Sequence, residues 1–242
     1  MVFFRRAVAL AVAGVLSASG SLGAAAAGPP TPALPAGIAP AERTRLHDLA
    51  AAAAVSTRVD AAAFPARREV FEYLLDHPEL ASHVARELKV ARYRIWRTPE
   101  GLAMDDGWGA TGRFSVVHAA PGTRVMYARG QFKKAMLPAL HGDAVTMIQY
   151  DVTPAAGGQS LVRAVVSGWV RLDSQLMTLA IRAASNIAQR KADLEARRLI
   201  RVFARVSQAI EDRPREVYEA LRRRPEVPAR DLAEFATLIE RH

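Results

Sequence analysis

The chain has 242 residues, contains no cysteine and carries a formal net charge of +9 at neutral pH. The lack of cysteine excludes disulfide bonds and an N-terminal cysteine that carries a lipid. The positive charge favours an anionic partner such as a membrane surface, although solubility alone would also account for it.

Residues 1–27 are typical of a secretory signal peptide. Arg5 and Arg6 precede an apolar run over residues 7–16, and four alanines at residues 24–27 end the segment. The alternative is a transmembrane anchor, but the apolar run is about half of the roughly twenty residues that a spanning helix needs. We therefore expect cleavage and export to the periplasm or out of the cell. Nucleic acid is not an expected partner there, whereas an anionic membrane surface is.

The next part of the chain, residues 28–54, is rich in proline and alanine. It predicts a lead-in that is flexible at first and weakly helical toward its end. Residues 55–64 favour a first strand. Two short helices follow at residues 67–75 and 78–88, because apolar side chains recur there at helical spacing.

The middle of the chain shows the alternation of apolar and polar residues that is typical of β-strands. Short connections such as Pro121-Gly122 favour antiparallel neighbours. The predicted strands cover residues 91–98, 102–105, 112–119, 123–132, 144–153 and 160–172. Such a sheet has an apolar face that another element must cover.

A long helical pattern follows at residues 175–210, and Asp173 or Ser174 is a suitable N-cap for it. Pro214 ends the pattern, and residues 212–242 predict a tail of one or two short helices. A helix that comes after the strands can lie across the sheet and enclose a cavity.

The predicted order is a strand, two short helices, six strands and a long helix. Together with the segment REVFEYLLDHPEL at residues 68–80, this order resembles the START-like, or SRPBCC, superfamily. The resemblance implies a ligand-binding domain over residues 55–211. It also implies an α+β helix-grip fold, in which a curved antiparallel sheet of seven strands wraps around the long helix and leaves an apolar cavity. Such proteins bind or transport lipids and other hydrophobic small molecules. The lead-in and the helical tail depart from the family pattern, which leaves the ligand open.

A cavity for a lipid needs a lining of apolar side chains, and methionine suits it because its side chain adapts its shape. The candidate residues come from the strands, their turns and the long helix. The alternative is that they fill an ordinary packed core. They are Trp96, Met104, Trp108, Phe114, Val116, Met126, Ala128, Phe132, Ile148, Val166, Met177 and Ile181.

No motif in the sequence points to catalysis, and we expect no catalytic residue and no cofactor. The six histidines lack the spacing of a zinc site, so no metal is expected either. If the same scaffold is an enzyme, such as a cyclase or hydrolase of a hydrophobic substrate, His118 and Tyr127 are the candidate polar groups. A third hypothesis is an envelope interaction protein that binds a partner through its helical tail.

Arginines recur along the second half of the long helix, and Arg197, Arg201 and Arg205 share one helix face. With the apolar residues beside them, they favour docking to an anionic membrane or to an acidic partner. The alternative is a solvated face whose charge is balanced by nearby acidic residues. Those acidic residues are Asp193, Glu195, Glu211 and Glu216.

Overall fold

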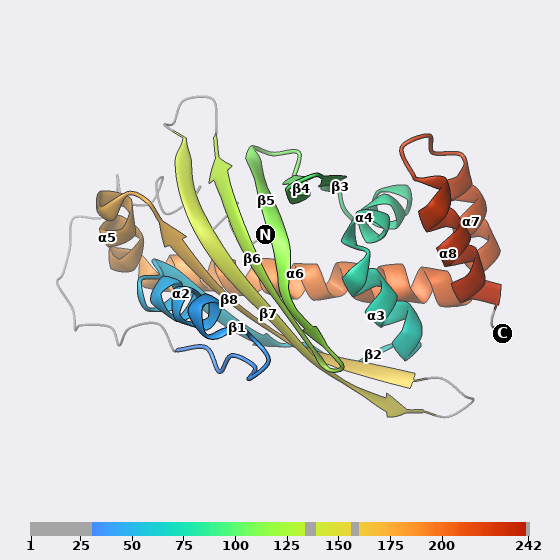
Figure 1. Ribbon diagram of the computed structural model, residues 1–242, viewed down its shortest axis with the longest axis horizontal. Helices are drawn as coiled ribbons and strands as arrows, with labels where there is room; N and C mark the ends of the chain where they lie inside the picture. Colours follow the sequence, from blue (N-terminus) through green and yellow to red (C-terminus); the bar gives the residue numbers. More distant parts are fainter. Residues whose placement is uncertain (1–30, 134–138, 156–159, 241–242) are drawn as a thin grey trace.

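The computed structural model describes residues 31–133, 139–155 and 160–240. These residues form one open antiparallel sheet of eight strands with helices on both faces (Figure 1). The α+β class predicted from the sequence is therefore confirmed. The predicted signal peptide, residues 1–27, lies outside the described residues.

The strands follow the order β1-β8-β7-β6-β5-β4-β3, and β2 pairs with β8 beyond the end of β1. Neighbouring strands are antiparallel throughout, as the short connections predicted. The last strand, β8, thus lies beside the first strand, β1. The strands are β1 (Val55–Asp60), β2 (Phe64–Pro65), β3 (Arg94–Thr98), β4 (Gly101–Asp105), β5 (Ala110–Ala120), β6 (Thr123–Phe132), β7 (Leu140–Pro154) and β8 (Ser160–Leu172).

The helices lie close to their predicted positions, with one difference. The long helix predicted at residues 175–210 is divided at Ala184, whose ψ of 29° departs from helical geometry. Neither glycine nor proline stands at the division. The helices are α2 (Pro40–Ala51), α3 (Arg68–Asp76), α4 (Pro78–Glu87), α5 (Gln175–Ala183), α6 (Ser185–Asp212), α7 (Pro214–Arg222) and α8 (Ala229–Glu240).

One face of the sheet is covered by α5 and by α6, which runs along the length of the molecule (Figure 1). Ile181 of α5 and Ala188 and Ala192 of α6 belong to the same buried cluster as Met104 and Phe114 of the sheet. The small alanine side chains allow the helix to lie close to the strands. Close packing of this kind excludes water and stabilises the fold at roughly 25 cal/mol per Å² of apolar surface.

The opposite face of the sheet is covered by α2, so the lead-in contributes to the core. Leu46 and Leu49 of α2 form a buried cluster with Val125, Val145 and Trp169 of the strands. This layer was not expected from the sequence, because α2 has few apolar side chains besides alanine. The central strands are consequently buried on both sides.

The second half of α6 extends beyond the sheet into a cluster of helices formed with α3, α4, α7 and α8. Val206 and Ile210 of α6 pack there with Leu80, Leu221 and Phe235. The last two of these residues come from the tail and are fully buried. The apolar face of the tail is therefore used within the fold.

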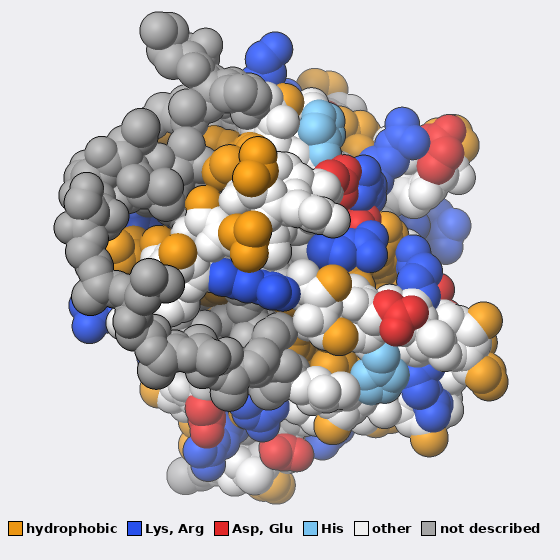
Figure 2. Space-filling view, turned by 90° about the vertical axis from the view of Figure 1, so that its left-hand side faces the viewer, with side chains coloured by type: hydrophobic (Ala, Val, Ile, Leu, Met, Phe, Trp, Pro, Cys, Tyr) orange, Lys and Arg blue, Asp and Glu red, His pale blue; other side chains and the backbone are white. Residues whose placement is uncertain are grey.

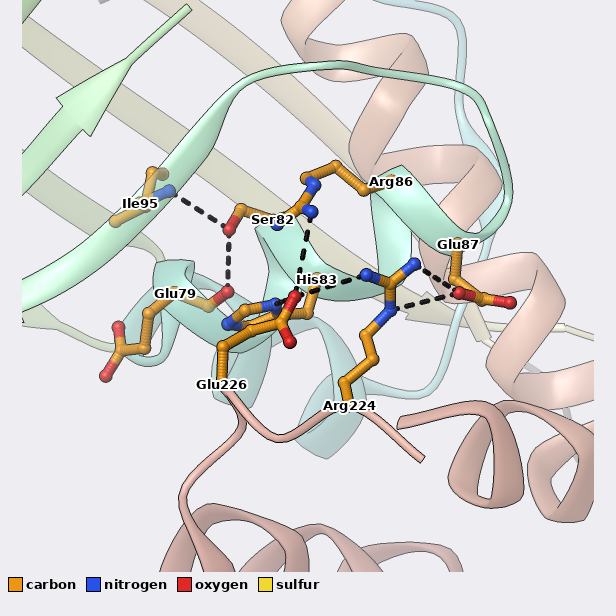
Figure 3. Close-up of polar contacts among 8 residues, drawn as sticks. All are labelled: Glu79, Ser82, His83, Arg86, Glu87, Ile95, Arg224 and Glu226. Carbon is orange, nitrogen blue, oxygen red and sulfur yellow. Dashed lines mark hydrogen bonds and ion pairs between the residues drawn. The ribbon is translucent and has the colours of Figure 1, made fainter. Parts of the chain in front are cut away.

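Polar contacts hold α4 between the sheet and the tail (Figure 3). The Ser82 hydroxyl donates to the Glu79 carbonyl at 2.8 Å and accepts from the Ile95 amide of β3 at 3.2 Å. On the other side, Arg224 of the tail donates to Glu87 at 3.0 Å. These bonds fix the end of α4 and the turn that follows it.

Candidate functional site

Nine of the twelve candidate ligand residues pack in the clusters between the sheet and the helices α5 and α6, and seven of the nine are buried. Met104, Phe114, Ala128, Phe132 and Ile181 are buried in the cluster between the sheet and α5–α6. Ile148 and Val166 are buried in the adjacent cluster, and Met126 and Met177 pack against these clusters while partly exposed. The structure thus brings these nine residues together between the sheet and the helices α5 and α6.

Three candidate residues lie at the surface instead. Trp96, Trp108 and Val116 expose 46%, 50% and 37% of their area. Trp96 pairs with Ala103 in the register between β3 and β4, on the face of the sheet away from α6. These residues therefore do not join the packed group.

A groove of about 360 Å³ lies beside the second half of α6 and opens to solvent. Its walls come from β2, from the turn after α4, and from α6 with the residue that follows it. This volume is at the lower end of the range of about 300–1,000 Å³ that small-molecule sites occupy. The lining residues are Phe64, Leu88, Val90, Arg201, Ala204, Arg205, Gln208, Ala209, Asp212 and Arg213.

The turn after α4 forms one wall of the groove because its backbone reverses at Lys89. Lys89 has φ of 56°, and the amides of Lys89 and Val90 donate to the carbonyls of Arg86 and Ala85 at 3.1 and 3.0 Å. A left-handed residue just after a helix is a common helix end. It places both Leu88 and Val90 in the groove lining.

The opposite wall is α6, where Ala204 and Ala209 leave space because their side chains are small. At this point the sheet edge consists of the two-residue strand β2, which contributes Phe64. The groove thus opens where the sheet ends and the helical cluster begins. Five of its lining residues are apolar and are called its apolar floor below, namely Phe64, Leu88, Val90, Ala204 and Ala209.

The groove carries three arginines and one aspartate. Asp212 accepts from Gln208 at 3.1 Å, and Arg213 lies 3.5 Å from Glu216. Arg201 and Arg205 have neither a hydrogen bond nor an ion pair with another side chain in the described part of the chain. Their guanidinium groups are therefore available to an anionic ligand.

A smaller hollow of about 20 Å³ lies nearer the start of α6 than the groove does, with Trp108, Tyr93 and Leu199 in its lining. It has room for roughly one water molecule. Within the described part of the chain, Trp108 lines this hollow, and none of the other candidate ligand residues lines the hollow or the groove. The Arg92 guanidinium lies 5.3 Å from the centre of the Trp108 ring, which is within range of a cation–π contact.

The two candidate polar residues of the enzyme hypothesis lie on the α2 side of the sheet. The Tyr127 hydroxyl donates to Asp143 at 2.6 Å, and the Arg45 guanidinium of α2 lies 3.9 Å from the ring centre. Burial and the bond to Asp143 raise the pKa of Tyr127. His118 pairs with Val125, whose side chain packs beneath α2. Neither residue lines the groove.

Asp143 is a buried carboxylate for which the sequence pattern predicted no role. Burial acts to raise the pKa of Asp143, but hydrogen bonds from Tyr127, Arg171 and Arg129 outweigh it and lower the pKa. Arg129 also donates to Asp173 at 2.9 Å. The network joins three neighbouring strands and has a structural role.

The described residues contain no group of three or more histidine, aspartate or glutamate side chains arranged to hold a metal ion. Among the described helices, α6 included, none combines the length and the apolar character that crossing a bilayer requires. The groove of about 360 Å³ is much larger than the hollow of about 20 Å³ that lies beside the same helix.

Comparisons with known proteins give little further guidance. No protein-family model matches the chain. A search of curated proteins found no match either. Among solved structures, the chain is similar to a hypothetical protein of Helicobacter pylori, jhp0584, over 63% of this chain and 86% of that chain. The identity is 10% and the TM-score is 0.39, so this similarity carries no argument about function.

Proposed function

We propose that this protein is an exported, non-catalytic protein that binds or transports an anionic amphiphile such as a fatty acid or an acidic lipid. The ligand lies in the groove beside α6, with its apolar part on the floor and its anionic group against the arginines. The observation that carries the proposal is the combination of an apolar floor with two arginines that have no described side-chain partner.

The apolar floor provides affinity but little selectivity. Burying about 100 Å² of an alkyl chain contributes roughly 2.5 kcal/mol before the costs of ordering the ligand are subtracted. Apolar contact alone therefore gives weak binding. A charged hydrogen bond from Arg201 or Arg205 adds about 1.5–3 kcal/mol and selects ligands with an anionic group.

The proposal includes the helix-grip arrangement of the START-like superfamily. Three features support it, namely the position of β1 beside β8, the two short helices between β1 and β3, and the long helix after β8. We place the ligand in the groove rather than under the sheet because the candidate residues under the sheet are packed against one another.

Two measurements on the purified protein test this function. Solvent extraction followed by lipid mass spectrometry should recover an anionic amphiphile, and titration should show uptake of a fluorescent fatty acid. Ala204→Trp fills the groove and should weaken that uptake at least about tenfold, since a bulky side chain excludes the alkyl chain. Arg113→Ala is the control, because this exposed arginine lies on β5, away from the groove.

A second variant tests the role of the charge. Arg205→Ala should weaken uptake of the fatty acid but leave uptake of the matching fatty alcohol unchanged, because the alcohol has no carboxylate. Absence of both recovered lipid and uptake, or undiminished uptake by Ala204→Trp, would contradict the proposal.

A further inference from the structure

The outer surface of α6 carries a stripe of arginines and aliphatic residues. Positions three and four apart lie on one face of a helix, and six residues follow that spacing without a break. All six are exposed to solvent. The residues of this outer stripe are Ile187, Arg190, Leu194, Arg197, Arg201 and Arg205.

Three of the four acidic residues that were expected to balance these arginines pair with other side chains, and the fourth is buried. Asp193 accepts from Thr57 of the sheet at 2.5 Å, and Glu195 is buried at 2% exposure. Glu211 pairs with Arg67 at 2.9 Å, and Glu216 of α7 lies 3.5 Å from Arg213.

None of the four acidic residues belongs to the outer stripe. The four arginines of the stripe form no ion pair with another side chain in the residues that the structure covers. The stripe therefore carries an excess positive charge.

The aliphatic residues of the stripe are unusually exposed for their size. Leu194 and Ile187 expose 63% and 48% of their area, and Leu176 and Leu179 of the adjacent α5 expose 80% and 63%. Figure 2, which looks onto the end of the molecule that carries α5, shows hydrophobic side chains at the surface there. Exposed leucines beside arginines are typical of a helix that lies in a membrane interface.

We infer that the outer stripe of α6 docks onto the surface of an anionic phospholipid bilayer. The arginines contact the phosphate groups, and Leu194 and Ile187 enter the boundary between the headgroups and the acyl chains. This inference goes beyond the groove, because Arg190, Leu194 and Arg197 do not line it. Arg201 and Arg205 belong to both surfaces, so a docked molecule presents the groove next to the lipid.

A bilayer fits the stripe better than an acidic protein or a nucleic acid does. Charge alone would suit all three partners. The aliphatic side chains distinguish them, because water-exposed leucines gain free energy by entering the acyl boundary and gain little against a phosphate backbone. The stripe also follows one side of a straight helix, and this shape matches a flat surface.

Vesicle sedimentation with the purified protein tests the inference. The protein should bind vesicles of phosphatidylglycerol and phosphatidylcholine in equal parts, and should bind phosphatidylcholine vesicles weakly. Binding should fall as salt is added, since salt screens exposed charges. The double variant Arg190→Gln/Arg197→Gln should bind the anionic vesicles about thirtyfold less, at about 1 kcal/mol per arginine. Leu194→Gln should bind about tenfold less.

The matched control is Arg94→Gln/Arg113→Gln, which removes two exposed arginines from strands β3 and β5. It should bind anionic vesicles like the unchanged protein. Equal binding to both vesicle types, or undiminished binding by the α6 double variant, would overturn the inference. Binding to a DNA duplex or an acidic peptide without binding to vesicles would overturn it as well. The α6 double variant should still take up soluble fatty acid, which separates this result from failure of the groove.

Discussion

The two halves of α6 are packed differently, although they belong to one continuous helix. The first half lies over the sheet, where Ala188 and Ala192 are buried among strand residues. The second half lies among helices, where Val206 and Ile210 pack against α4, α7 and α8. The groove of about 360 Å³ borders the second half.

This difference shows how a groove can form where packing of a helix on a sheet changes to packing of a helix on other helices. A long strand provides a regular surface that a helix with small side chains can approach closely. At β2 that surface shrinks to two residues, and the turn at Lys89 takes its place. The side chains of an irregular turn and a helix do not interdigitate fully, so space remains between them.

The largest expected effect concerns the helical cluster around the second half of α6. Phe235 is fully buried, and Phe235→Ala should lower the free energy of unfolding by about 3–5 kcal/mol, because the cavity it leaves has no atoms to fill it. Leu194→Ala, at a position that is 63% exposed, should change it by less than about 0.5 kcal/mol. Urea unfolding of both variants measures the contrast. Similar losses of unfolding free energy in the two variants would show that the tail is not part of the core.

A pair of substitutions compares the two halves of α6 directly. Ala192 is 2% exposed under the sheet, so Ala192→Leu should lower the free energy of unfolding by about 1–3 kcal/mol through overpacking. Ala204 borders the groove, and Ala204→Leu should leave stability within about 0.5 kcal/mol while it weakens fatty-acid uptake. Thermal unfolding and ligand titration report these effects. If Ala192→Leu leaves the free energy of unfolding unchanged, the interior between the sheet and α6 has room for the larger side chain and is not closely packed there.

A smaller effect should appear as a dependence of stability on pH. Burial lowers the pKa of His83 in α4, and the nearby Glu226 opposes this only in part (Figure 3). Below about pH 6.5 the unfolded chain takes up a proton that native His83 resists, so stability should fall as the pH decreases through that range. His83→Gln should lose less stability than the unchanged protein between pH 7 and pH 5, as measured by urea unfolding at each pH. Equal losses of stability in the two proteins would mean that His83 does not contribute to the pH dependence.

Much of the fold could be predicted from the sequence because alternation and helical spacing are local signals. The strands from β3 to β8 and the short helices α3 and α4 lie close to their predicted ranges. The layer formed by α2 could not be predicted, since its few apolar residues, such as Leu46 and Leu49, show little helical periodicity.

The site was harder to predict than the fold. Apolar residues on strands indicate which face of the sheet is buried, and on that basis Phe114 and Met126 were predicted to line a cavity. The groove depends instead on Phe64, Val90 and Ala204, which are far apart in the chain and meet through tertiary packing. The spacing of Arg201 and Arg205 was visible in the sequence, but it predicted a face that docks to a membrane or an acidic partner rather than a groove.

Photocrosslinking tests the central claim that the ligand lies in the groove. The protein is incubated with a fatty acid that carries a diazirine near the end of its chain, irradiated, digested and mapped by mass spectrometry. The account predicts labels on peptides that contain Phe64, Val90 or Ala204, and loss of these labels in Ala204→Trp. Labels concentrated on Phe114 and Met126 instead would place the ligand under the sheet and contradict the account.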